Sequence, residues 1–321
     1  MDQYITQRGP AKIEGADIGP DTMAVVPDPG PLNLPLDKVY KAKNEIVIPF
    51  DAFPISHLSF SSLKNYLSNP AGWYRQYVLK QYDNDLSPAA LVGRTIHKQL
   101  ECFYKGLSWE KSFEITASFF EENVRAVTDW KKTGSPEKCW NEIVSGLRDL
   151  KRAIAKRKLP KQDDGVLFVE SPLVQACGFS IPIKVIPDLA VKKKSGIDIY
   201  DWKKVSAFNE TAPAVYWIQA YFNIKVIEKQ TGEFVRGMTF VEIKPKTSKT
   251  ADLSEAIRTI VIPNNPSSIE FRAIRRLIDF MLKDIAGVER HFLPNVTDMY
   301  AGDDEWMRFL EETNNDPAYS L

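Results

Sequence analysis

Two aspartates are spaced so that a β-hairpin would bring their side chains together. Residues 185–191 and 197–203 are rich in Ile and Val and are joined by a polar stretch that ends in Gly, which is typical of two paired strands. Folding the arms symmetrically about the Lys194–Ser195 bond places Asp188 opposite Asp201. Directly opposed side chains on one sheet face lie about 4.5–5.5 Å apart. Two carboxylates that close repel each other, and a hard cation such as Mg²⁺ relieves the repulsion because it binds carboxylate oxygens.

A lysine completes this group. Lys203 follows Asp201 by two residues and therefore projects from the same face of the strand. A divalent cation can supply a nucleophilic water and stabilise charge on phosphate oxygens, which is the chemistry that phosphodiester hydrolysis needs. Lys203 would orient the water or stabilise the phosphate charge. Glu170, just before the hairpin, could add a carboxylate or be an edge charge, and the whole group could equally be a surface hairpin with a cross-strand charge pair.

One histidine stands on a helix-like stretch well before the hairpin. Gly93, His97 and Glu101 are spaced four residues apart, so they share one face of a helix that Ser87–Pro88 is expected to start. Gly93 leaves space beside the imidazole ring, through which a metal or a phosphate could approach. Taken alone, an isolated helical histidine is more often structural or exposed.

These residues resemble a known family. Pro187–Asp188, a gap of twelve residues and then Asp201–Trp202–Lys203 is similar to the signature of the PD-(D/E)XK nuclease superfamily. The N-terminal motifs of the RecB-type branch are matched in order and spacing by Leu58–Tyr66, Asn69–Pro70, Trp73–Tyr74 and Gly93–His97. The resemblance covers residues 55–245 and implies a metal-dependent DNA nuclease.

The resemblance also implies a site and a cofactor. The expected cofactor is Mg²⁺ or Mn²⁺, and imidazole as an added ligand favours Mn²⁺. The expected metal ligands are His97, Asp188, Asp201 and the backbone carbonyl of Trp202, with Glu170 as an additional candidate. The expected catalytic residues are Asp188, Asp201 and Lys203. Gln219 would contact DNA or position the lysine.

The chain departs from the branch at two points. A Gln-x-x-x-Tyr helix usually follows the lysine, but here Asn223 stands four residues after Gln219 and Tyr221 only two. Some members bind an iron–sulfur cluster through four cysteines, whereas this chain has 3 cysteines in all, so a self-contained Cys₄ cluster is excluded.

The overall charge gives little support for a protein that covers DNA without regard to sequence, since such proteins are normally basic. The formal net charge is +0, although basic residues gather locally. Lys192, Lys193 and Lys194 are at the tip of the expected hairpin and are the candidates for contacting a phosphate backbone. A solvated surface is the alternative interpretation of each basic cluster, including those within residues 148–161 and 244–249.

The order of elements predicts an α/β fold. Helices, three strands, a helix, a strand and a last helix from Ile269 to about Phe292 indicate a small mixed β-sheet flanked by helices, with an added N-terminal helical region. The resemblance implies a restriction-endonuclease-like core. We expect an extended or disordered arm over residues 1–45, the helical region with the His motif over 46–160, and the nuclease core over 161–321.

Composition limits the location and the partners. The chain has no apolar run near the 18–20 residues that a bilayer requires, and its cysteines are few and irregularly spaced, so we expect a cytoplasmic protein. A bacterial cell or a phage-infected host would suit the family. The sequence has no Gly-x-x-x-x-Gly-Lys-Ser/Thr loop, which excludes a motor of that type.

Three interpretations stay open at this stage. The first is an exonuclease that acts on DNA ends or single strands in recombination, repair or replication, alone, as a homo-oligomer, or beside a helicase or annealing protein. The second is a catalytically inactive relative that binds DNA or serves as a scaffold subunit. The third is an unrelated α/β protein in which the hairpin is a coincidence.

Overall fold

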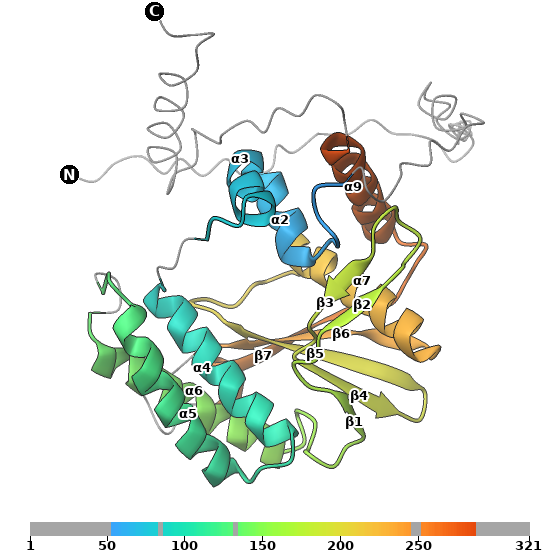
Figure 1. The fold of residues 1–321 in the computed structure, drawn as a ribbon. Helices are drawn as coiled ribbons and strands as arrows, with labels where there is room; N and C mark the ends of the chain where they lie inside the picture. The colour runs from blue at the N-terminus through green and yellow to red at the C-terminus, as the bar shows by residue number, and fades with distance from the viewer. Residues whose placement is uncertain (1–52, 83–85, 131–133, 245–251, 287–321) are drawn as a thin grey trace, which may run out of the picture. The chain divides into compact units, whose positions relative to one another are not determined.

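The structure, a computed structural model, describes residues 53–82, 86–130, 134–244 and 252–286. These residues form a mixed five-stranded sheet with helices on both faces (Figure 1). The α/β class and the small mixed sheet are therefore confirmed. The expected arm, residues 1–45, lies outside the described residues. Within the described ranges no helix combines the length and the apolar character that crossing a membrane requires.

The sheet follows the order β1-β4-β5-β6-β7. Its strands are β1 (Val166–Phe168), β4 (Leu189–Lys193), β5 (Gly196–Lys204), β6 (Val235–Ile243) and β7 (Ile257–Pro263). The β5–β6 pair is parallel and the other pairs are antiparallel. A parallel pair needs a crossover connection, which the helix α7 (Ala214–Thr231) supplies. Strands β2 (Leu173–Gln175) and β3 (Ile183–Val185) form a separate two-stranded sheet, which the sequence did not predict.

The expected hairpin is present in the expected register. Leu189 pairs with Tyr200 and Lys193 with Gly196, which is the symmetric arrangement about the Lys194–Ser195 bond. Gly196 has φ +131°, and a Cβ there would lie 2.5 Å from the carbonyl oxygen of Phe234, so only glycine fits.

The first arm of the hairpin is shorter than predicted. Val185 belongs to β3 in the other sheet, and β4 begins only at Leu189. Pro187 explains the break, because proline cannot donate a ladder hydrogen bond.

Three long helices cover one face of the sheet. They are α4 (Pro88–Tyr104), α5 (Trp109–Asn123), which ends in the 3₁₀ turn η3 (Val124–Ala126), and α6 (Pro136–Ala155). Each begins after a serine whose hydroxyl accepts a backbone N–H of the first turn. The expected helix from Ser87–Pro88 to Tyr104 is confirmed. The short helix α8 (Leu253–Ala256) precedes β7.

The opposite face carries the remaining helices. They are α2 (Phe60–Ser68), α3 (Pro70–Trp73) with the π-helical turn η2 (Tyr74–Val78), α7 and α9 (Ile269–Ile285). Ser59 caps α2, because its hydroxyl accepts the N–H of Ser62. The last helix is described only to Ile285, so its expected extension to Phe292 lies outside the described residues.

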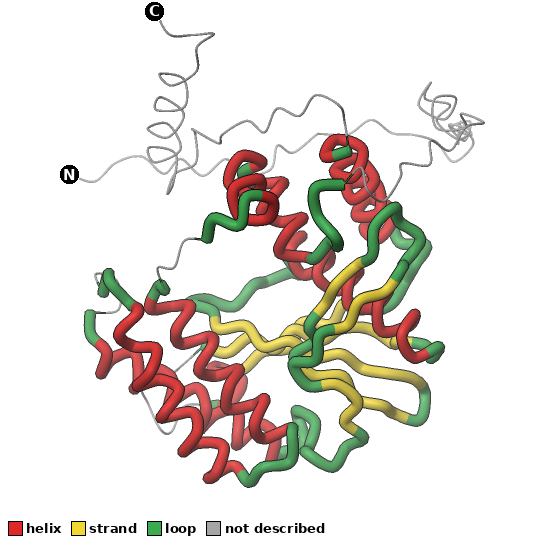
Figure 2. Tube along the Cα trace, in the orientation of Figure 1, coloured by secondary structure: helices red, strands yellow, loops and turns green. Residues whose placement is uncertain are grey.

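Helices lie on both sides of the sheet (Figure 2), and successive side chains of β5 point to alternate sides. Ile197 and Ile199 belong to the core under α2, α7 and α9, whereas Trp202 belongs to the core under α4 and α6. By this alternation Asp201 and Lys203 fall on the α7 face. On this face of β5 the apolar residues Ile197 and Ile199 are therefore followed by the charged residues Asp201 and Lys203, near the carboxyl end of the strand.

Candidate metal centre

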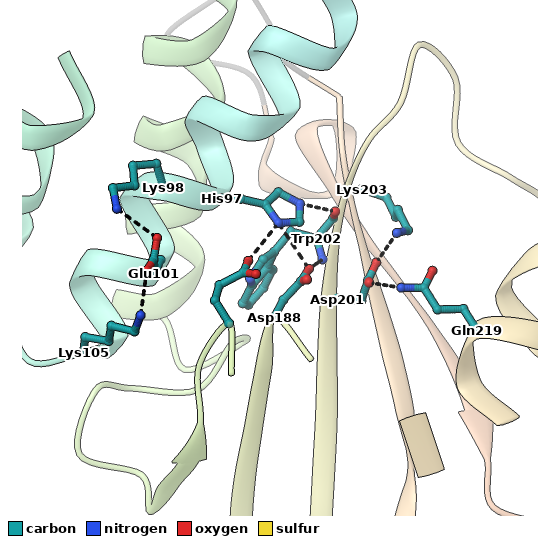
Figure 3. Close-up of polar contacts among 10 residues, drawn as sticks. His97, Lys98, Glu101, Lys105, Asp188, Asp201, Trp202, Lys203 and Gln219 are labelled. Carbon is teal, nitrogen blue, oxygen red and sulfur yellow. Dashed lines mark hydrogen bonds and ion pairs between the residues drawn. The ribbon is translucent and has the colours of Figure 1, made fainter. Parts of the chain in front are cut away.

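His97 of α4 reaches the end of the hairpin. Its Nδ1 lies 3.2 Å from Glu170 Oε1 and 3.6 Å from Asp188 Oδ2, and its Nε2 lies 2.9 Å from the carbonyl oxygen of Trp202 (Figure 3). One potential ligand atom from each of His97, Glu170 and Asp188 lies within 4.8 Å of the other two. The structure thus brings together three of the side chains named from the sequence, and the named backbone carbonyl.

Asp188 is fixed against the neighbouring strand. Its Oδ2 accepts the backbone N–H of Trp202 at 2.8 Å, and the residue is 9% exposed. Because β4 and β5 pair next to this point, the bond holds the carboxylate beside both Trp202 and His97.

Asp201 forms a second group with Lys203 and Gln219. Lys203 Nζ forms an ion pair with Asp201 Oδ2 at 2.7 Å, and the amide nitrogen of Gln219 donates to Oδ1. Asp201 is 2% exposed, and its Oδ2 accepts no hydrogen bond of good geometry. The carboxylate is therefore directed to Lys203 and Gln219 and lies apart from the His97 group (Figure 3).

The two groups share an excess of negative charge. Burial, with Asp201 next, raises the pKa of Asp188 well above its ordinary range. Burial alone would lower the pKa of His97, but Asp188, Glu170 and Asp201 outweigh it and raise that pKa to about 9. In this environment the site favours an additional positive charge, whether a proton or a cation.

These donors fit a hard divalent cation. Carboxylate oxygens are the preferred ligands of Mg²⁺, and an imidazole nitrogen extends the set toward Mn²⁺. Asp201 Oδ2 is a buried carboxylate oxygen of the same kind, and its ion-pair partner is Lys203. His97, Glu170, Asp188 and the carbonyl of Trp202 would hold the ion, with Asp201 beside them.

Glu170 reaches this position through an unusual backbone conformation. Its φ is +46°, which is uncommon for any residue other than glycine. Its backbone N–H bonds the carbonyl of Pro187 at 2.9 Å, just before Asp188. β1 ends at Phe168, so Glu170 lies two residues beyond the end of this strand. Strain of this kind is often found at functional sites.

A cleft of about 570 Å³ borders the His97 group. His97, Glu170, Trp202 and Lys203 line it, as does Gly93. No atom lies within 4 Å of the place where a Cβ of Gly93 would be, so the expected space beside His97 is present.

The hairpin lysines lie at the other end of the hairpin. Lys192 pairs with Glu233 at 2.6 Å, and Lys193 pairs with Asp164 at 3.4 Å. Five residues of β4 separate this end from Asp188, which at the usual rise per residue is about 16 Å. Contact of Lys192, Lys193 and Lys194 with DNA stays a prediction.

Glu242 on β6 was missed from the sequence. It is fully buried and pairs in register with Lys203. Its carboxylate accepts the hydroxyl of Tyr216 at 2.9 Å and the backbone N–H of Asn209 at 3.1 Å. The available signal was a lone charge within the apolar run Phe240–Ile243, since such runs are typical of strands buried on both faces.

Comparison with known proteins agrees with this geometry. The model of the PD-(D/E)XK nuclease superfamily matches residues 57–298, so the chain belongs to this superfamily. The expected family is thereby confirmed, and nucleases of this superfamily use divalent metals. No curated protein shows a significant similarity to the chain.

Solved structures also match parts of the chain, at low identity. A proposed exonuclease from Eubacterium rectale is 14% identical, with a TM-score of 0.49 over 72% of this chain and 80% of the other. LHK-Exo in complex with dAMP is 10% identical, with a TM-score of 0.26 over 61% of this chain and 91% of the other.

Proposed function

We propose that this protein is a divalent-metal-dependent deoxyribonuclease of the RecB-type branch, which hydrolyses phosphodiester bonds as an exonuclease. One observation carries the proposal. His97 from α4 meets Glu170 and Asp188 at the carbonyl of Trp202, and the two residues that flank Trp202, Asp201 and Lys203, form an ion pair. Ligands for a cation and the ammonium group of Lys203 thus line one cleft.

Each side chain has a role in the proposed reaction. A bound Mg²⁺ or Mn²⁺ would supply a water of lowered pKa and stabilise charge on the phosphate oxygens. Lys203, held 2.7 Å from Asp201, would add a positive charge where the phosphate becomes more negative. Gln219 holds Asp201 from its other side and so limits the positions that Lys203 can adopt.

The proposed substrates are DNA ends or single strands in recombination, repair or replication. The sequence lacks the phosphate-binding loop of a motor ATPase, and the protein would act alone, as a homo-oligomer, or beside a helicase or an annealing protein. With 3 cysteines in the chain, we propose no iron–sulfur cluster.

A scaffold without catalysis is the second candidate. Asn223 stands where the branch has a tyrosine, and the net charge is +0. Under this proposal the protein binds DNA through the same fold but does not cut it.

A cleavage assay separates the two candidates. End-labelled single-stranded, double-stranded and circular DNA are incubated with Mg²⁺ or Mn²⁺ and with each variant. We expect Asp201→Asn to lower the cleavage rate about 100-fold or more, because it removes a carboxylate and the partner of Lys203. Asp198→Asn is the matched control, since Asp198 lies on the same strand but pairs with Arg236.

The outcomes are distinct. Survival of circles alone would support an end-dependent enzyme. Binding of DNA by the unaltered protein, without cleavage in either metal, would favour the scaffold and contradict the nuclease.

A further inference from the structure

A second pocket, of about 330 Å³, lies one side chain away from Asp201. Gln219 connects the two places, since it lines this pocket and also donates to Asp201. We call it the Lys184 pocket. The lining residues that matter here are Ser59, Phe60, Ser61, Lys184, Gln219 and Asn223. Apart from Gln219, which positions Asp201, no residue of the candidate metal centre lies among them, and none of these side chains is a proposed metal ligand.

One side of the Lys184 pocket attracts anions. The nine-residue helix α2 begins there, and its first turn contains no acidic residue. Helix N-termini favour negative groups because their first N–H groups lack partners. The hydroxyls of Ser59 and Ser61 lie 3.0 Å apart at this end. Lys184 forms no ion pair with any residue that the structure describes, so its charge is available to a ligand.

Another side presents hydrogen-bond acceptors without donors. Asn223 is 4% exposed, and its Oδ1 has no hydrogen-bond partner. The amide nitrogen of Gln219 is used by Asp201, which leaves its buried Oε1 without a partner as well. Buried acceptors without partners lower stability, so two beside one pocket indicate a ligand that brings N–H donors.

A nucleotide has the matching chemistry. Its phosphate suits Lys184 and the start of α2, the N–H groups on the edge of its base suit the two amide oxygens, and its flat ring suits Phe60. The pocket adjoins Asp201 through Gln219, so a DNA strand at the metal centre would pass next to it.

We propose that the Lys184 pocket is a nucleotide subsite, which holds the nucleotide beside the bond to be cleaved. Its phosphate lies toward Lys184 and its base edge toward Gln219 and Asn223. The proposal rests on the proposed nuclease function for the identity of the polymer, but binding of a single nucleotide can be tested without cleavage.

The first test measures binding without metal. The full-length protein is titrated with deoxycytidine monophosphate, whose base carries an amino group, and separately with inorganic phosphate. We expect Lys184→Gln to weaken binding of the nucleotide about tenfold, as loss of one charged contact would. Lys111→Gln, on the exposed face of α5, is the matched control and should leave the affinity unchanged.

The second test uses the buried amide. We expect Asn223→Leu to raise the melting temperature, because it removes an acceptor without a partner, and to weaken binding of the nucleotide but not of phosphate. A lower melting temperature with unchanged affinity would show that Asn223 is structural and would overturn the proposal. Equal affinity for phosphate and nucleotide would also overturn it, since only an anion site would remain, as would the absence of binding.

Cleavage then separates the two proposals. If the protein cuts DNA, Lys184→Gln should raise KM about tenfold and change kcat by less than about twofold, because the substitution removes ground-state and transition-state binding alike. If the protein cuts nothing but Lys184→Gln still loses the nucleotide, the subsite stands and the nuclease proposal fails. Cleavage with an unchanged KM in Lys184→Gln would overturn the subsite alone.

Discussion

At the scale of single residues, the candidate metal centre has more carboxylates than positive charges, since Glu170, Asp188 and Asp201 all lie near His97. The pKa of Asp188 is raised by burial and by Asp201, and that of His97 is raised to about 9 by its carboxylate neighbours in spite of burial. The folded protein therefore holds protons more tightly than the unfolded chain does. For His97, the associated stability is complete below pH 6.5 and is lost as the pH rises through about 9. The raised pKa of Asp188 acts in the same direction.

This arrangement predicts how metal and pH affect stability. Without metal, we expect the melting temperature to fall between pH 6.5 and pH 9. Mn²⁺ should raise it more at pH 8.5 than at pH 6.5, because the cation replaces the protons of the site. Thermal unfolding at both pH values checks this.

Asp188→Asn provides the control for the metal effect. It should abolish most of the stabilisation by Mn²⁺ and should flatten the pH dependence. An Mn²⁺ effect that is equal at both pH values would contradict proton displacement as its cause.

At the scale of elements, the β5–α7–β6 crossover supports the lysine. Lys203 Nζ lies 6.0 Å from the ring centroid of Phe240. The ring of Tyr216 stacks on the ring of Phe240, with 4.1 Å between the two centroids. The hydroxyl of Tyr216 then donates to Glu242, which also accepts the N–H of Asn209 in the loop that follows β5. Glu242 thus joins β6, α7 and this loop behind Lys203.

The crossover predicts a large effect of one buried substitution. Glu242→Leu leaves the N–H of Asn209 and the hydroxyl of Tyr216 without their acceptor, so we expect it to lower the free energy of unfolding by about 2–3 kcal/mol. Glu233→Gln breaks only the exposed pair with Lys192 and should change it by less than about 1 kcal/mol. Urea denaturation measures both values. Equal effects would show that Glu242 does not anchor the crossover.

At the scale of the whole molecule, the centre lies where two helical layers meet the same sheet. His97 comes from the α4 layer and Gln219 from the α7 layer, while the carboxylates come from the sheet and its connections. A net charge of +0 means that attraction to DNA depends on a few local cations. Several of these are already paired, such as Lys98 with Glu101.

The charge balance predicts a shallow salt dependence. With about two or three phosphate contacts, the affinity for double-stranded DNA should fall roughly 10- to 40-fold between 50 and 200 mM salt. Equilibrium binding with Ca²⁺ in place of the active metal measures this. A loss of a thousandfold or more would instead indicate an extended basic surface and would revive the hairpin-tip lysines as DNA contacts.

Much of the local structure could be predicted because its causes are local. The turn at Gly196 and the alternation of the two arms fixed the hairpin register, and Ser87–Pro88 fixed the start of α4. The arm before Asp188 was overestimated, since the apolar run continues through Pro187 into a different sheet. The cap of α2 is not decided by the sequence, because both Ser59 and Ser61 satisfy the capping pattern.

Periodicity, caps and turns act over a few neighbouring residues, so the amino-acid sequence was enough to predict which residues could do chemistry and which elements carry them. Which of these residues meet depends on how the elements pack. His97 contacts Glu170 across 73 positions and Trp202 across 105, and Glu242 lies behind Lys203 through strand pairing alone. Such contacts result from packing of the two layers on the sheet, and no local pattern of residues encodes them.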